Sequence, residues 1–195
     1  MSIRQKEKTE ITKRELKKTA QNLFLSKGYE DTSIQEIAAA AGYSVGSVYR
    51  QWKGKQQLFM EIWDEYVSGF IRESVINAPE NPDSEAMIEY LLRRSRIFAE
   101  EEMTKKMYLT SVILSANYEY EGVADWAHKY QQMLYLFLKQ VSGCTDEQRL
   151  KTTASILHCL LNADAMSTSR IKSPRYEFQY ETLKNSLSAI VEACK

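Results

Sequence analysis

The chain has 195 residues, 44% of them hydrophobic, which is enough for one large or two small domains with a substantial core. Only 7 Gly and 3 Pro interrupt it, so the composition is that of a helical protein. The formal net charge is zero, which by itself argues against nucleic-acid binding, and the 3 Cys have neither a metal-binding spacing nor the even number of a disulfide set.

The charge is unevenly distributed along the chain. Residues 1–60 contain 11 Lys and Arg against 6 Asp and Glu, a net charge of +5, whereas residues 61–195 contain 15 against 20, a net charge of −5. Phosphate contacts are therefore expected from the first part only, with an affinity that falls as salt rises. There is no recognisable signal peptide and no apolar run of transmembrane length, so the chain is expected to be cytoplasmic.

The first helix is predicted over residues 10–27, with Gly28 as its stop. The polar residues before it are expected to be mobile; such an arm can reach a DNA groove, but a solvated tail is the more common role. One face of the helix is apolar and is expected to pack on the elements that follow; its residues are Leu16, Ala20, Leu23 and Phe24.

Two short helices at a tight turn are predicted next. Thr32 is expected to cap the first of them, because its hydroxyl can accept a backbone N–H and Gln35 can complete a capping box. Gly42 can adopt the left-handed conformation that ends this helix, and Ser44 can cap the second. The spacing therefore indicates a helix, a sharp turn and a helix.

The second of these helices, over residues 44–51, directs Val48 and Trp52 inward and leaves small, hydroxylated, aromatic and basic side chains outside. Small side chains allow close approach to a major groove, while hydroxyl groups, Tyr and Arg bond phosphates and base edges. We interpret it as the recognition helix of a helix-turn-helix. The candidate DNA-binding residues of the module are Thr32, Ser33, Gln35, Ser44, Val45, Gly46, Ser47, Tyr49, Arg50 and Lys55.

This module resembles the tetracycline-repressor-like (TetR) family of transcriptional regulators over residues 10–60. The residues that carry the resemblance are Phe24, Gly28, Tyr29, Thr32, Ile37, Ala38, Ala41, Gly42, Ser44, Gly46, Tyr49, Lys55 and Leu58. The chain departs from the family pattern at Tyr43, Gln51 and Trp52. The resemblance implies an all-α fold in which a three-helix DNA-binding module precedes a helical domain for ligand binding and dimerisation.

A long helix is predicted over residues 55–76, with Lys55 in its first turn, where backbone amides and the ammonium group can both face a phosphate. The domain boundary is placed at its start, with a DNA-binding domain over residues 1–54 and a ligand-binding and dimerisation domain over residues 55–195. Later helices, which bring the total to about nine, are predicted over residues 84–101, 103–117, 122–142, 146–168 and 175–193. A capping box starts the fourth of these at Thr145.

The later helices carry many aromatic and Met side chains. Aromatic residues at helical spacing are usually core, but each buried hydroxyl group needs a partner, so the 12 Tyr favour an apolar pocket with scattered polar groups. Such a pocket suits a small organic effector, whereas no cofactor or metal is expected. The candidate ligand-binding residues are Trp63, Tyr66, Phe70, Tyr90, Phe98, Met107, Tyr108, Trp126, Tyr130 and Met133.

Apolar stripes also mark the last two helices. The family resemblance implies that these helices form a four-helix interface between two subunits, and a two-fold dimer would supply the second recognition helix. The candidate interface residues are Leu157, Leu161, Leu183, Leu187, Ile190 and Val191. Structural hydrogen bonds are favoured over ligand contacts for His158, Asn162 and Asp164, and core packing is favoured over a redox role for Cys159.

The chain is predicted to be a dimeric, ligand-responsive transcriptional regulator, with repression favoured over activation. It would bind a pseudo-palindromic operator in double-stranded DNA through the major groove and be released by the effector. An enzyme is not expected, because no phosphate loop, nucleophile elbow, HExxH helix or CxxC pair is present, and no membrane partner is expected. The alternative is a helical small-molecule-binding protein without a DNA role, which would have no reason to expose Tyr49 and Arg50 together.

Overall fold

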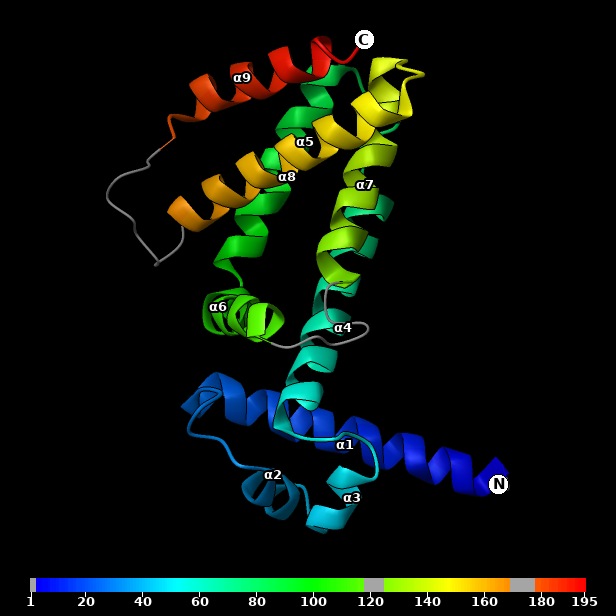
Figure 1. Cartoon of the computed structure of the whole chain (residues 1–195), viewed down its shortest axis with the longest axis vertical. Coiled ribbons are helices and arrows are strands. Elements are labelled where there is room, and N and C mark those ends of the chain that lie inside the picture. Colours follow the sequence, from blue (N-terminus) through cyan, green and yellow to red (C-terminus); the bar gives the residue numbers. More distant parts are fainter. Residues whose placement is uncertain (1–2, 118–124, 169–177) are drawn as a thin grey trace. The chain divides into compact units, whose positions relative to one another are not determined.

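The computed structural model describes residues 3–117, 125–168 and 178–195. Within these ranges the chain forms nine α-helices and no strand, which confirms the predicted all-α fold (Figure 1). The helices are α1 (Ile3–Lys27), α2 (Ile34–Ala40), α3 (Val45–Tyr49), α4 (Lys55–Ile76), α5 (Ser84–Glu100), α6 (Glu102–Asn117), α7 (Asp125–Ser142), α8 (Glu147–Thr168) and α9 (Tyr180–Glu192). The helix starts predicted at Gly122 and Arg175 lie outside the described residues.

The chain divides into two compact units. Unit 1 comprises Met1–Tyr66 and Lys106–Val123, and unit 2 comprises Val67–Lys105 and Ala124–Lys195. Helix α4 contributes its first turns to unit 1 and its remaining turns to unit 2. The boundary predicted at residue 55 from the sequence stays a prediction.

In unit 1, α2 packs against both α1 and α3. The predicted inward positions are confirmed, because Val48 and Trp52 are 0% and 1% exposed. The rings of Phe24, Tyr29 and Phe59 meet with centroids 5.0 to 5.7 Å apart, which joins α1 to the start of α4. The other large apolar side chains of this core are Leu16, Ile37, Leu58 and Trp63.

The two predicted glycine stops are confirmed by their backbone angles. Gly28 and Gly42 have φ values of +91° and +73°, in the left-handed region that residues with a Cβ rarely adopt. The predicted start of the first helix is wrong, because α1 already begins at Ile3. The polar residues expected to form a mobile arm are therefore helical from that point.

Both predicted capping boxes are wrong by one residue. Ser33, not Thr32, caps α2, since its hydroxyl oxygen accepts from the Glu36 backbone N–H at 3.1 Å. Thr32 is buried instead and donates its hydroxyl hydrogen to the Gly28 carbonyl at 2.7 Å, which closes the turn after α1. At α8, the Asp146 carboxylate accepts from the backbone N–H groups of residues 148 and 149, each at 3.0 Å, so Asp146 takes the place predicted for Thr145.

Unit 2 is a bundle in which α5, α7, α8 and α9 pack on one another. Asp83 caps α5, and its carboxylate accepts from the Ala86 backbone N–H at 2.8 Å. The core of the bundle combines apolar side chains of all four helices, among them Met87, Leu91, Leu92, Leu134, Leu138, Leu150, Leu157, Leu161, Leu183, Leu187 and Val191.

Candidate nucleic-acid interface

The polar side chains of α3 and its two ends bond to one another, and Ser47, which is buried, lies between Ser44 and Arg50. The hydroxyl oxygens of Ser44 and Ser47 lie 3.0 Å apart, and the Arg50 guanidinium donates to the Ser47 hydroxyl oxygen at 2.8 Å. Ser44 is the N-cap residue of α3, as expected, but its side chain makes no bond to a backbone N–H of the helix. Tyr49 is 54% exposed beside this group.

The predicted DNA-binding residues differ in exposure. Six are exposed, namely Ser33, Gln35, Ser44, Gly46, Tyr49 and Arg50. Val45 and Lys55 are half-buried, whereas Thr32 and Ser47 are buried. The last two are therefore not presented to a ligand in this conformation, and the DNA contacts assigned to all ten residues stay predictions.

A surface hollow of about 380 Å³ joins the start of α2 to the end of α3 and the start of α4. Five predicted DNA-binding residues meet there, and the complete lining is Glu30, Asp31, Thr32, Ser33, Ile34, Gln35, Tyr49 and Lys55. Since two of these residues are acidic, a phosphate could be accepted only on the side of the hollow that carries Lys55 and the backbone amides.

Lys55 has partners within the chain. Its ammonium group donates to the carbonyl oxygens of Tyr29 and Glu30 at 2.7 and 3.2 Å, and it lies 4.2 Å from the centroid of the Tyr29 ring. Carbonyl oxygens at these distances and a ring face both stabilise a cation. Lys55 therefore stabilises the turn that precedes α2, besides the phosphate contact predicted for it.

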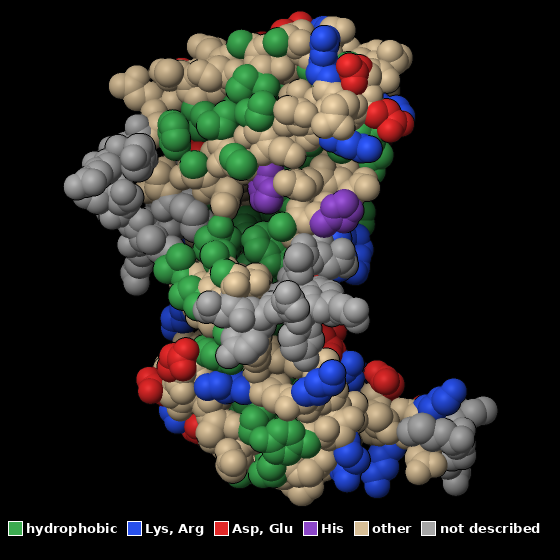
Figure 2. Space-filling view, viewed as in Figure 1, with side chains coloured by type: hydrophobic (Ala, Val, Ile, Leu, Met, Phe, Trp, Pro, Cys, Tyr) green, Lys and Arg blue, Asp and Glu red, His purple; other side chains and the backbone are tan. Residues whose placement is uncertain are grey.

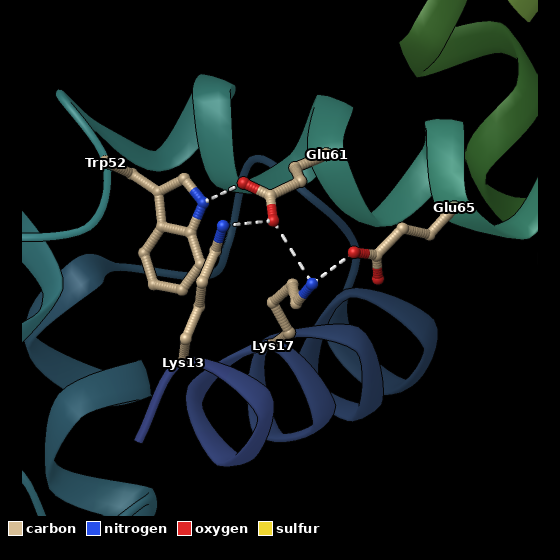
Figure 3. Close-up of polar contacts among 5 residues, drawn as sticks. All are labelled: Lys13, Lys17, Trp52, Glu61 and Glu65. Atoms are coloured by element: carbon tan, nitrogen blue, oxygen red, sulfur yellow. Dashed lines mark hydrogen bonds and ion pairs between the residues drawn. The ribbon is translucent and has the colours of Figure 1, made fainter. Parts of the chain in front are cut away.

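A polar network that sequence reasoning missed lies beside the recognition helix (Figure 3). The Trp52 indole N–H donates to one carboxylate oxygen of Glu61 at 2.7 Å, and the ammonium groups of Lys13 and Lys17 lie 2.8 and 3.1 Å from the other. Lys17 also pairs with Glu65. The sequence signal was Trp52 itself, because a buried indole N–H needs an acceptor.

The network shifts the pKa of two of its members. Partial burial opposes ionisation of Glu61, but hydrogen bonds from Lys13, Trp52 and Lys17 outweigh it and hold the Glu61 pKa below its ordinary value. Burial likewise acts to lower the pKa of Lys17, yet the bonds to Glu65 and Glu61 raise it. The Glu61 carboxylate and the Lys17 ammonium group are therefore both charged at neutral pH, and they are paired with each other within the chain.

Lysine and arginine side chains are prominent over α1 on the face of unit 1 drawn in Figure 2. Those that are exposed and described include Lys6, Lys8, Arg14 and Lys18. This exposure agrees with the net positive charge of residues 1–60.

The predicted ligand-binding residues fall into two groups. In unit 1, the fully buried Trp63 lies 5.5 Å from Tyr66 and 6.2 Å from Tyr108 between ring centroids, and Met107 is 1% exposed. In unit 2, Phe70 and Phe98 lie 4.6 Å apart. Each pair is ordinary aromatic packing by its geometry, so its assignment to a pocket stays a prediction.

Arg94 was not predicted, yet it connects several of the aromatic residues of unit 2. Its guanidinium carbon lies 4.4 Å from the Phe70 ring centroid, and its Nε–H donates to the Ser74 hydroxyl oxygen at 3.1 Å. Tyr90 donates its hydroxyl hydrogen to the Ser74 carbonyl oxygen at 2.6 Å. The structure therefore places Arg94 against Phe70, whose ring packs on that of Phe98, and bonds both Arg94 and Tyr90 to Ser74.

Tyr130 and His158 form a second aromatic pair in unit 2, with ring centroids 5.1 Å apart. Burial raises the pKa of Tyr130 and lowers that of His158. Of the other predicted ligand-binding residues, Met133 is 3% exposed in the bundle core and Trp126 is half-buried.

An open groove of about 790 Å³ lies on unit 2. It runs along α5 and is lined by Asn77, Pro79, Ala86, Glu89, Tyr90, Arg93, Arg96, Ile97, Glu100, Glu101, Glu102 and Tyr180. Tyr90 is the one member that was predicted to bind a ligand. Half of its lining residues are charged, four Glu and two Arg, whereas the pocket expected from the sequence was apolar with scattered polar groups.

Acidification should destabilise the fold through His158. Because burial lowers its folded-state pKa, the unfolded chain binds a proton first as the pH falls below the ordinary value of 6.5. Stability is therefore lost as the pH drops from 6.5 toward the folded-state pKa. Thermal unfolding of wild type, His158→Asn and the exposed control His128→Asn between pH 7.5 and 5 measures this loss. The unfolding temperature of His158→Asn should fall less on acidification than that of wild type or of the control. Equal decreases in the three proteins would contradict this prediction.

The predicted dimer residues are covered within one chain. Leu157, Leu161, Leu183, Leu187 and Val191 are at most 4% exposed in the core of unit 2, and Ile190 is half-buried beside it. These residues of α8 and α9 thus pack within the helical bundle of unit 2, and their role in a dimer interface stays untested.

Two expectations about polar and Cys residues have opposite outcomes. Asp164 is fully buried, and both its oxygens accept from Arg96 at 2.7 Å, which confirms the predicted structural hydrogen bond. Cys159 is exposed, so the packing predicted for it is wrong, because the residue lies on the outer side of α8.

Among the described residues, no helix is long and apolar enough to cross a membrane, and no group of three His, Cys, Asp or Glu side chains could hold a metal ion.

Two solved structures share the fold over nearly the whole chain. A TetR transcription regulator from Haloarcula marismortui has a TM-score of 0.64 at 18% identity, covering 95% of this chain and 98% of that one. The FadR regulator of Bacillus subtilis, solved in complex with stearoyl-CoA, has a TM-score of 0.63 at 13% identity, covering 93% and 98%. At these identities the likeness establishes the fold.

Sequence comparison locates the family signal in the helix-turn-helix module. The HTH-type transcriptional regulator AcrR of Shigella flexneri is 38% identical over 64 residues, which are 33% of this chain and 30% of the length of that protein. The family model of bacterial regulatory proteins of the tetR family matches residues 16–62, which contain α2, α3, Trp52 and Glu61. The helix-turn-helix module of this chain therefore matches the tetR family of bacterial regulatory proteins, over about a quarter of the chain.

Proposed function

We propose that this protein is a DNA-binding transcriptional regulator that recognises a pseudo-palindromic operator through α3 and acts as a repressor. The observation that carries the proposal is the exposed surface of α3, where Tyr49 and Arg50 stand beside small residues within a module that matches the family model. Side chains of these types can bond phosphates and base edges after close approach to a major groove. The basic residues of α1 supply non-specific attraction to the same surface.

The proposed regulator is a two-fold dimer, because two recognition helices are needed for a pseudo-palindromic site. The dimer faces that we propose are the outer sides of α8 and α9, opposite the buried leucine stripes. Each outer side carries exposed uncharged residues at the same spacing. On α8 they are Thr152, Ile156, Cys159 and Ala163, and on α9 and its C-cap they are Thr182, Ser186, Ala189 and Ala193. Small uncharged side chains allow helices of two subunits to approach closely and exclude water.

Replacing Ile156 with Glu should dissociate this dimer. Ile156 is 43% exposed in the single chain, so the substitution costs the monomer little, but it buries a carboxylate at the proposed interface. The expected result is a dimer dissociation constant raised by about a hundredfold. Sedimentation velocity at several concentrations measures it, with the exposed Ile97→Glu on α5 as the matched control. A monomeric wild type, or an unchanged Ile156→Glu dimer, would contradict this interface.

The proposed effector is a small organic molecule bound by unit 2. The support is the group of aromatic side chains around Arg94, together with a related fold solved with stearoyl-CoA. The effector would favour one conformation through α4, which has turns in both units, and DNA and effector would then weaken each other's binding by the same factor.

Selection of genomic fragments by the purified full chain, at moderate and at raised salt, tests the function. The expected result is recovery of an inverted repeat whose retention falls steeply with salt. Recovery of nothing above background at either salt would favour the alternative, a helical small-molecule-binding protein without a DNA role. The recovered operator then serves to screen organic compounds for release of the protein.

A further inference from the structure

The last turn of the recognition helix is fixed through the side chain that follows it. The Trp52 backbone N–H donates to the Val48 carbonyl oxygen at 3.0 Å, so the backbone of Trp52 belongs to the end of α3. Its indole is 1% exposed and donates to Glu61 of α4 at 2.7 Å. The position of this ring therefore depends on a carboxylate of another helix.

The same carboxylate is bonded to a third element. Its second oxygen lies 2.8 and 3.1 Å from the ammonium groups of Lys13 and Lys17 on α1, and Lys13 also lies 5.8 Å from the centroid of the Trp52 ring (Figure 3). Glu61 thus contacts the end of α3 and two turns of α1 from the second turn of α4.

These bonds differ from ordinary surface ion pairs. The Glu61, Lys13 and Lys17 side chains are 27%, 28% and 17% exposed, so solvent screens them only in part. A hydrogen bond to a charged acceptor is also among the stronger ones in proteins, and a buried indole N–H that loses its acceptor is costly.

We infer that Glu61 is a positioning residue for the recognition helix, whose carboxylate holds the Trp52 indole and thereby the last turn of α3 against α1 and α4. The inference rests on the proposed DNA-binding role of α3. It predicts the direction in which operator affinity changes when Glu61 is removed, because Glu61 is an anion in a module that would bind a polyanion. If its charge alone mattered, removing it would strengthen DNA binding, whereas loss of positioning would weaken binding.

Four variants of the full chain separate these effects. Glu61→Ala removes both the charge and the acceptor, and Glu61→Gln removes the charge but keeps an oxygen that can accept from Trp52. Trp52→Phe removes the N–H donor, puts a smaller ring in the buried site and leaves the net charge unchanged. Glu65→Gln, one turn further along α4, is the matched control, because it removes the same charge without touching Trp52.

Operator affinity is the first readout, with thermal unfolding to verify that each variant is folded. Glu61→Ala and Trp52→Phe should each weaken binding about tenfold, and the double variant should be no weaker than either, because both remove the same bond. Glu61→Gln should stay within about threefold of wild type, and Glu65→Gln should bind as tightly as wild type or more tightly. The inference would be overturned if Glu61→Ala, Glu61→Gln and Glu65→Gln all bound the operator more tightly than wild type and with the same affinity as one another.

Amide hydrogen exchange in the free protein is the second readout and does not require an operator. The backbone N–H groups of Arg50 and Gln51, which bond to the Gly46 and Val48 carbonyl oxygens, should exchange about tenfold faster in Glu61→Ala, with Ala41 of α2 unchanged. If wild type binds no DNA, the proposed function fails, and this exchange result alone decides whether Glu61 positions α3. Unchanged exchange at Arg50 and Gln51 would overturn that.

Discussion

Replacing Tyr49 with Ala should weaken operator binding by about tenfold to a hundredfold and leave thermal unfolding unchanged. Tyr49 is 54% exposed at the end of α3, so its ring contributes little to the core of unit 1. On DNA, the same ring would lie against the sugar-phosphate backbone or a base edge, and a dimer would lose two such contacts. Titration of the recovered operator at fixed salt measures the loss.

Tyr49 is a cleaner probe of the DNA surface than Lys55. Because the Lys55 ammonium group holds the carbonyl oxygens of Tyr29 and Glu30, Lys55→Ala would also loosen the turn before α2, and its effect on binding would mix two causes. Leu109→Ala on α6 is the matched control, since Leu109 is 51% exposed and has no proposed DNA role. Equal operator affinity for wild type and Tyr49→Ala would remove Tyr49 from the interface.

The helix-turn-helix could be predicted from sequence because its determinants are local. Gly28 and Gly42 end helices through backbone conformations that few other residues adopt, and Val48 and Trp52 mark the inner side of a very short helix. The caps were wrong by one residue because neighbouring hydroxyl and carboxylate groups are nearly equal as caps. At α2, Thr32 bonds back to the Gly28 carbonyl oxygen, and Ser33 is the cap.

The parts that sequence could not predict depend on contacts between distant residues. Periodicity identified the apolar stripe of α8 but not the helices that it packs on, so it could not show that Leu157 and Leu161 lie in the core of unit 2. The pairing of Glu61 with Trp52, like that of Arg94 with Phe70, requires knowing which helices meet. Spacing along one helix carries no such information.

Replacing Arg96 with Met should have the largest effect on stability, a loss of about 3–5 kcal/mol in the free energy of unfolding. Asp164 is 0% exposed and accepts two hydrogen bonds of 2.7 Å from the guanidinium group, whose carbon also lies 4.8 Å from the Tyr180 ring centroid. Met preserves most of the aliphatic stem but leaves the buried carboxylate without this counter-ion. The unfolding temperature should fall by about 10 °C or more.

Two further variants distinguish loss of the ion pair from loss of packing. Arg93→Met on the same helix should change stability by at most about 0.5 kcal/mol, because Arg93 is exposed and its guanidinium carbon lies 6.0 Å from the Tyr90 ring centroid. The double variant Arg96→Met with Asp164→Asn should be more stable than Arg96→Met alone, since the amide carries no charge to strand in the core. If the double variant were less stable than Arg96→Met, the cost would lie in packing and hydrogen bonding around α5, α8 and α9, and the charge of Asp164 would not be its cause.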